Sequence, residues 1–128
     1  MSNREPFVLV DIGARGGAHP RWQALQGHLL EVLFEPEPLA RQALQEAGGG
    51  GRRVLDCAVA GNRGTRDFHV LEWAAGSSLL EPDPAICGRY PYIGDYIRIQ
   101  KTLQVETRTL DEALEGEGLP AVDFLKLD

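Results

Sequence analysis

The sequence predicts an α/β protein built on a parallel sheet with crossover helices. Two observations support this fold class. Continuously apolar segments of strand length recur along the chain, and helix-prone segments separate them, which is the alternation typical of parallel sheets. The chain has 128 residues, enough for one hydrophobic core and too few for two. We therefore expect residues 1–128 to form a single domain.

Four segments are expected to form the core strands, and the first is continuously apolar, as a strand covered on both faces should be. They are Pro6–Ile12, Leu29–Phe34, Arg53–Val59 and Val122–Leu127. The second one stops at an acid followed by proline, which cannot continue a ladder of hydrogen bonds.

Helical signals lie between these strands. Pro20 suits a first helical position. Residues 38–47 form the most helix-prone stretch, and four glycines at 48–51 end it. A third helix is expected from Thr109, because Glu112 stands three residues later and the two can form a capping box.

The middle of the chain departs from the alternation. Residues 62–65 read as a turn, and residues 66–71 alternate in polarity like a strand, so we expect an antiparallel β-hairpin inserted after the third core strand. Residues 75–92 are rich in glycine, proline and serine and predict a loop. Residues 97–107 alternate again and predict another strand.

Composition excludes some classes of protein. Acids outnumber bases by 19 to 13, giving a net charge of −6, which argues against general binding of nucleic acid. The N-terminal apolar run is too short for a signal peptide or a membrane span, so we expect a cytoplasmic protein without a membrane partner. Cys57 and Cys87 lack a CxxC spacing and are expected to be reduced thiols. No grouping of residues has the spacing of metal ligands.

The stretch VLVDIGARGG predicts a ligand site. It joins a buried strand to a glycine-rich turn, and ligands of open parallel sheets lie beyond the carboxyl ends of the strands. Gly13 and Gly17 would let a ligand approach main-chain N–H groups. Asp11 stands at the strand end, and Glu35 follows the second strand, 24 residues later, where it can accept hydrogen bonds from ribose hydroxyls. The combination predicts a nucleoside site.

The ligand is further restricted by what the turn lacks. A dinucleotide fold prefers GxGxxG, because a pyrophosphate must approach a helix N-terminus, and this turn carries an acid instead. A nicotinamide-dependent oxidoreductase is therefore disfavoured. The cation S-adenosylmethionine fits better, since its ammonium and sulfonium groups tolerate carboxylates. A non-catalytic nucleoside-binding or interaction module remains the alternative to an enzyme.

The order of motifs resembles the FkbM family of S-adenosylmethionine-dependent methyltransferases over nearly the whole chain. The matching segments are VDIGARGG, FEP, AVAGNRGTRDFHV, SSLL, VETRTLDEAL and DFLKLD. The resemblance implies a Rossmann-like class I methyltransferase sheet. It also implies O-methylation of a hydroxyl on a small-molecule acceptor, often a sugar or specialised metabolite.

The resemblance also implies roles for individual residues. Asp11, Gly13 and Gly17 would line the methionine side of S-adenosylmethionine, Glu35 would bind its ribose, and Asp128 would lie near the methionine and the transferred methyl group.

Other candidates for the site keep two interpretations. Arg15 either contacts the carboxylate of the cofactor or faces solvent. Ala58 is expected to close the third strand beside the adenine, with Asp56 less well placed inside that strand. His19 is expected to be a loop or cap residue, and no catalytic base is assigned. Three tyrosines either wall an acceptor pocket or cover the core: Tyr90, Tyr92 and Tyr96.

Members of the family continue beyond the motif DFLK(I/L)D with V-x-G-x-E, whereas this sequence ends at Asp128. We therefore expect a sheet truncated after its fourth core strand, with the last strand beside the first. The outer edge of that last strand would be unpaired, which favours self-association.

Overall fold

The computed structural model of the protein describes residues 4–119 and 121–128. The chain divides into two compact units, one formed by Met1–Gly64 with Glu106–Asp128 and the other by Thr65–Val105. The single domain expected from length stays a prediction.

The first unit contains a four-stranded parallel sheet in the order β3-β2-β1-β7. Its strands are β1 (Phe7–Ile12), β2 (Leu29–Phe34), β3 (Arg52–Leu55) and β7 (Phe124–Leu127). The parallel α/β sheet is confirmed, as is the placement of the last strand beside the first. Strand β1 is central in the sheet and its apolar run is buried, as expected where helices cover both faces.

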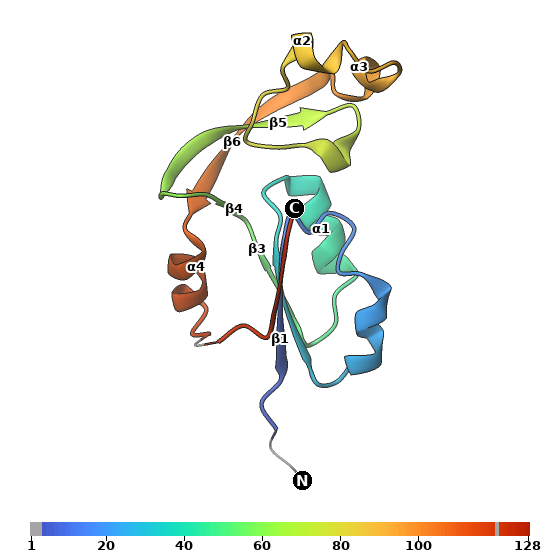
Figure 1. Cartoon of the computed structure of the whole chain (residues 1–128). Helices are drawn as coiled ribbons and strands as arrows, with labels where there is room; N and C mark the ends of the chain where they lie inside the picture. Colours follow the sequence, from blue (N-terminus) through green and yellow to red (C-terminus); the bar gives the residue numbers. More distant parts are fainter. Residues whose placement is uncertain (1–3, 120) are drawn as a thin grey trace. The chain divides into compact units, whose positions relative to one another are not determined.

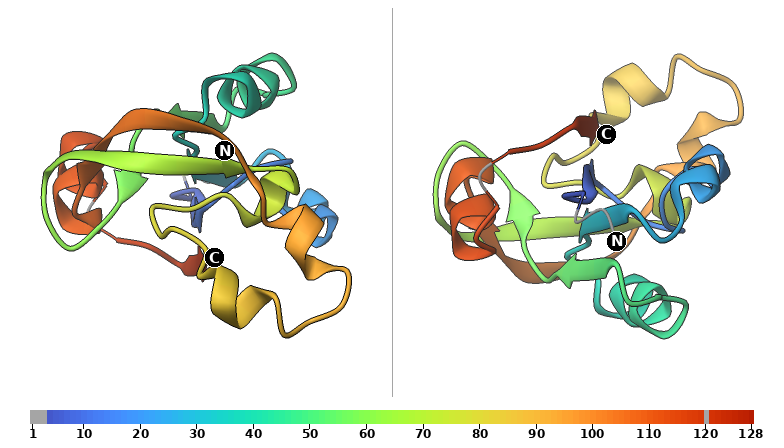
Figure 2. Two further views of the ribbon diagram at one scale, coloured as in Figure 1. Left: turned by 90° about the horizontal axis from the view of Figure 1, so that it is seen from above. Right: turned by 90° about the horizontal axis from the view of Figure 1, so that it is seen from below.

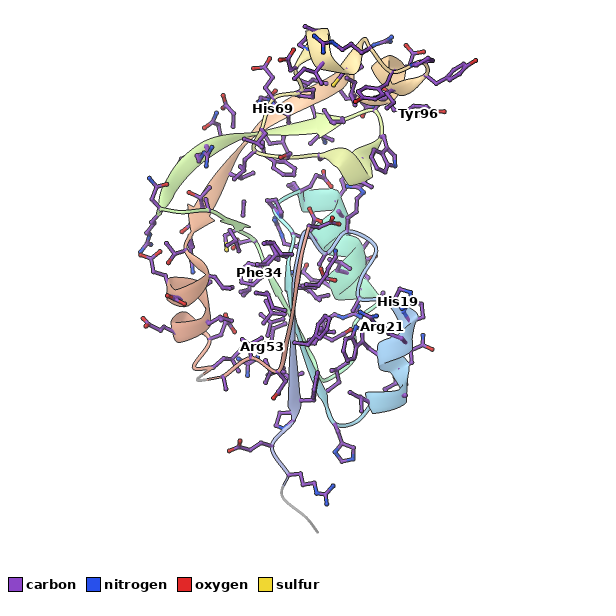
Figure 3. The ribbon with its side chains drawn as sticks, in the orientation of Figure 1. His19, Arg21, Phe34, Arg53, His69 and Tyr96 are labelled. Atoms are coloured by element: carbon purple, nitrogen blue, oxygen red, sulfur yellow. The ribbon has the colours of Figure 1, made fainter. Side chains whose placement is uncertain are left out.

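Helices cover both faces of this sheet (Figure 1). Helix α1 (Pro38–Glu46) and the 3-10 helix η1 (Pro20–Leu25) lie on one face, and α4 (Leu110–Gly116) lies on the other. Alternate residues of β1 and β2 therefore enter different parts of the core. Phe34 faces α4 and is almost fully buried (Figure 3), whereas Leu33 packs against Leu44 of α1.

The expected helix at Pro20 is a short 3-10 helix held by aromatic contacts. The ring centroid of Trp22 lies 5.6 Å from that of Phe7 and 4.8 Å from that of Phe124. The guanidinium of Arg21 stands over the Trp22 ring at 5.1 Å. Trp22 is thus a packing residue that joins η1 to β1 and β7.

The end of the third strand differs from the prediction. Strand β3 stops at Leu55, whose carbonyl accepts the N–H of Glu35 at 3.1 Å. Ala58 belongs to a separate strand, β4 (Ala58–Val59), which pairs in parallel with β6 (Ile99–Arg108) in a second sheet. The expectation that Ala58 closes the third strand is wrong, because the chain changes sheets between Leu55 and Ala58.

The second unit is built on β5 (Gly64–Leu71) and β6, which run side by side (Figure 2). The residue numbers of the contacting side chains rise along β5 while those of their partners on β6 fall, so the two strands are antiparallel. These contacts are Asp67 with Gln104, His69 with Thr102 and Glu72 with Gln100. Strand β5, which was expected to form an antiparallel hairpin after the third core strand, thus pairs with β6 across a long connection.

That connection holds short helices and exposed aromatic side chains. It contains η2 (Ala74–Gly76), α2 (Pro84–Cys87) and α3 (Ile93–Tyr96). Trp73 is 57% exposed. Three tyrosines are also exposed and therefore do not cover a core: Tyr90, Tyr92 and Tyr96.

Three further features of the chain concern its surface and its thiols. Cys57 is 1% exposed in the first unit, Cys87 is partly buried in the second, and both are free thiols. On β7, Leu125 and Leu127 are exposed, and the self-association expected at this edge stays a prediction. Across residues 4–119 and 121–128, the structure contains no helix with the length and apolarity needed to cross a membrane.

Helix α4 begins with the predicted capping box. Thr109 Oγ1 accepts the N–H of Glu112 at 3.2 Å, and Glu112 Oε2 accepts the N–H of Thr109 at 3.1 Å. The box fixes the start of a helix that brings Ala113 into the core cluster of Val10 and Phe34.

Replacement of Thr109 by alanine tests this cap. Thr109→Ala should lower the free energy of unfolding by about 1 kcal/mol, because a helical N–H loses its acceptor. Urea denaturation followed by circular dichroism measures the loss. Thr109→Ser keeps the hydroxyl and should retain most of the stability, and a serine variant as unstable as the alanine variant would show that the methyl group matters instead.

Candidate functional site

The glycine turn follows directly after β1 and is fastened to β2. The N–H groups of Gly13 and Ala14 both donate to the carbonyl of Phe34, at 3.2 and 3.1 Å. Gly13 and Gly17 have φ angles of 77° and 87°, a region that favours glycine. A Cβ at Gly13 would stand 3.3 Å from the Cβ of Asp128, so the turn also passes close to the end of β7.

Asp11 lies on β1 one residue before its end and is only 4% exposed. Its Oδ1 forms an ion pair with Lys126 Nζ at 3.0 Å. Among the described residues, this oxygen is the buried side-chain polar atom without a hydrogen bond. Burial raises the pKa of Asp11, and the Lys126 ammonium opposes that rise.

Lys126 was missed from sequence, although it joins three parts of the site. Its Nζ lies 3.2 Å from Asp128 Oδ2 and donates to the carbonyl of Gly13 at 3.3 Å. It neighbours Asp11 because the two residues are in register across the parallel strands β1 and β7. The sequence signal was the lysine at the third position of FLKL. It becomes informative only when that strand is placed beside β1, in register with Asp11.

Glu35 directly follows β2 and is 4% exposed. Its Oε1 accepts the N–H of Glu37 at 2.9 Å, which fixes the carboxylate against the main chain. Burial raises the pKa of Glu35, while the Glu37 N–H and the charge of Arg15 act in the opposite direction. A buried acid thus stands at the carboxyl end of the second strand, as predicted.

Arg15 is partly exposed and points to a second buried acid. Its Nη1 lies 3.7 Å from Glu37 Oε2, and the same oxygen accepts the N–H of Ala40 at 2.7 Å. Glu37 is therefore the N-cap of α1 as well as the partner of Arg15. Sequence reasoning missed it, although an acid directly before Pro38 is a recognisable start of a helix.

The end of β3 adds another acid to this edge. Asp56 comes directly after β3 and is exposed, so the expectation that it lies within the strand is wrong. Ala58, on β4, is buried. Since the strands are parallel, acids stand at or just past the carboxyl ends of all four: Asp11, Glu35, Asp56 and Asp128.

A hollow of about 520 Å³ lies between the turn and α1, within the size range of ligand pockets. Its two charged residues are already engaged, Arg15 with Glu37 and Arg52 with Glu31 at 2.7 Å. The remaining lining is mostly small: Gly16, Gly17, Ala18, Ala40, Ala43, Leu44 and Ala47. The groups available to recognise a ligand are therefore the four acids at the strand ends.

Other candidates have structural roles or are not grouped. His19 Nδ1 accepts the N–H of Arg21 at 3.2 Å and so caps η1, as predicted. No three of the described histidine, cysteine, aspartate and glutamate residues gather in a way that could hold a metal ion.

Glu35→Gln tests the electrostatic cost of the buried acid. Because burial raises the folded pKa above 4.5, the ionised wild type loses stability as the pH rises through that folded pKa. The glutamine variant should therefore be more stable than the wild type at neutral pH, with no gain below about pH 4. Urea denaturation at both pH values measures this, and Glu115→Gln, on the exposed side of α4, is the control. A neutral-pH loss of stability in Glu35→Gln would contradict the argument.

The chain matches a known protein family and a curated relative. Residues 11–128, from the buried acid of β1 to the last residue, match the methyltransferase FkbM domain. The chain is 27% identical over 133 residues to the 2-O-methyltransferase NoeI of Sinorhizobium fredii (strain NBRC 101917 / NGR234). That match covers 94% of this chain and 52% of NoeI, so the chain spans about half the length of this curated relative. No solved structure matches the chain. The extent of the domain match shows that the chain belongs to the FkbM methyltransferase family.

Proposed function

We propose that this chain binds S-adenosylmethionine and belongs to an enzyme that transfers the methyl group to a hydroxyl oxygen. The observation that carries the proposal is the pair of buried acids, Asp11 and Glu35, at the ends of adjacent strands beside a turn with positive-φ glycines. Membership of the FkbM family supports it.

Glu35 has the properties of a ribose-binding residue. Its carboxylate is acceptor-only when ionised, and the hydrogen bond from Glu37 N–H holds it in one orientation. Each oxygen has capacity for a further donor, so the two ribose hydroxyls can bind without displacing the main chain. Burial strengthens these bonds, because water competes less for the carboxylate.

The methionine end of the cofactor fits the region around Asp11. The buried Oδ1 of Asp11 is ion-paired with Lys126 and makes no hydrogen bond within the described residues, so the carboxylate has capacity to accept one from the ammonium of the cofactor. Gly13 and Gly17 keep the nearby backbone free of side chains. Asp128 adds a second carboxylate on the same side. The positive charge of Arg15 suits it to bind the carboxylate of the cofactor.

The adenine would then lie toward the end of β3. Asp56 stands there as an acceptor suited to an exocyclic amine, and Ala58 contributes a small apolar side chain. A pyrophosphate is a poorer match for this edge, because the acids would repel it and the turn lacks the GxGxxG spacing.

When bound, S-adenosylmethionine supplies a methyl group on a positively charged sulfur, ready for transfer to a nucleophile. The residues of this chain would bind and orient it, leaving the methyl group toward the acceptor. The name of NoeI describes that protein as a 2-O-methyltransferase, which favours an oxygen acceptor here too. A hydroxyl of a sugar or specialised metabolite is the acceptor class we propose.

Calorimetry with S-adenosylmethionine tests the cofactor, and Glu35→Gln tests the site. The wild type should bind, and the variant should bind about 10-fold to 100-fold more weakly, since a hydrogen bond to a charged group contributes about 1.5–3 kcal/mol. Because the variant is expected to be the more stable protein, weaker binding cannot be attributed to unfolding.

Glu115→Gln should bind like the wild type, and NADH should not bind to either protein. Absence of S-adenosylmethionine binding by the wild type at about 1 mM, equivalent to a binding free energy weaker than about −4 kcal/mol, would refute the proposed cofactor.

A further inference from the structure

We infer that Lys126 is a positioning residue that acts through Asp11: its ammonium holds Asp11, Asp128 and the glycine turn in the arrangement that accepts a cationic cofactor. This inference rests on the proposed function, because it concerns how the same site is kept ready for binding.

The geometry gives the ammonium three acceptors. Nζ lies 3.0 Å from Asp11 Oδ1, 3.2 Å from Asp128 Oδ2 and 3.3 Å from the carbonyl oxygen of Gly13. One ammonium therefore holds all three groups, with a hydrogen bond to the Gly13 carbonyl and ion pairs to the two carboxylates. They come from β1, from the turn after it and from the residue after β7, which are otherwise joined here by the Asp128 N–H donating to Ile12 O at 3.3 Å.

The charge of Lys126 matters most for Asp11. A carboxylate that is 4% exposed tends to take up a proton, because burial disfavours its ionised form. Lys126 counteracts this tendency. Its own pKa is raised, since burial, which lowers it, is outweighed by Asp11 and Asp128, and the side chain therefore stays protonated at neutral pH.

The other charges around Asp11 do not replace this partner. Asp128 and Glu31 both act to raise the pKa of Asp11, as like charges do. Glu31, on β2, is itself paired with Arg52 at 2.7 Å. Among the described residues, Lys126 is the cation that contacts Asp11.

Loss of Lys126 should therefore change how binding depends on pH. A protonated Asp11 offers a cation no negative charge, so apparent affinity falls with the ionised fraction of Asp11. Without the ammonium, Asp11 takes up its proton at a higher pH. If its pKa lies one unit above the pH of measurement, only about one tenth is ionised, and affinity falls about tenfold.

The test compares Lys126→Met, Lys126→Arg and Lys101→Met in the intact protein. The sequence contains only these two lysines, so Lys101→Met removes the same charge from the second unit. The first measurement is the pH titration of the Asp11 carboxyl carbon by NMR in the cofactor-free protein. The second is the affinity for S-adenosylmethionine, by calorimetry from about pH 5 to about pH 9.

In Lys126→Met, Asp11 should titrate at a higher pH than in the wild type, and affinity should recover as the pH rises. Lys126→Arg and Lys101→Met should resemble the wild type in both measurements. If the methionine variant does not fold, Lys126→Gln keeps a polar side chain without the charge and replaces it.

An unchanged Asp11 titration in Lys126→Met would overturn the inference. A loss of affinity that is equal at every pH would also overturn it, because that result indicates a purely structural role. Failure of the wild type to bind S-adenosylmethionine would refute the proposed cofactor instead, and the NMR titration would still decide whether Lys126 controls Asp11.

Discussion

Parallel pairing of β1 with a neighbour on each side is the constraint on which the candidate site depends. Parallel strands end at the same edge, so one register fixes several side chains together. Pairing with β7 sets Asp11 beside Lys126, and pairing with β2 sets Ile12 beside Phe34, whose carbonyl then fastens the glycine turn. Glu35 is the next residue along β2 and joins the same edge. A slip of one residue would turn Asp11 toward the α4 face and dismantle the site.

Burial of charged groups at the same edge is unfavourable to the stability of the fold. Two carboxylates that are nearly inaccessible to water stand there with pKa values raised by burial. Apolar residues at these positions would give a more favourable core, and this cost is why we propose that the acids serve to bind a ligand. The protein limits the cost with local partners: a backbone N–H and Arg15 for Glu35, and Lys126 for Asp11.

Much of the fold follows from local sequence, because apolar runs, a proline after an acid and a capping box act over a few residues. These signals predicted β1, β2, α1 and the start of α4. The glycine turn and Glu35 were likewise recognisable. The end of β3 was not, since Asp56 and Cys57 look as compatible with a strand as their neighbours, and only the change of sheet at Ala58 marks the boundary. The role of Lys126 could be recognised only from the register of β1 and β7, because its partner Asp11 lies 115 positions away in the chain.

The contrast between the two thiols gives each unit a different chemical accessibility. Cys57 is enclosed in the first unit, and burial raises the pKa of its thiol, so little of the reactive thiolate form is present. Cys87 belongs to the second unit and is partly open to solvent. A fluorophore or spin label carried by a maleimide would therefore attach selectively to the second unit. A label on Cys87 would thus allow the second unit to be followed by spectroscopy while a ligand is added to the protein.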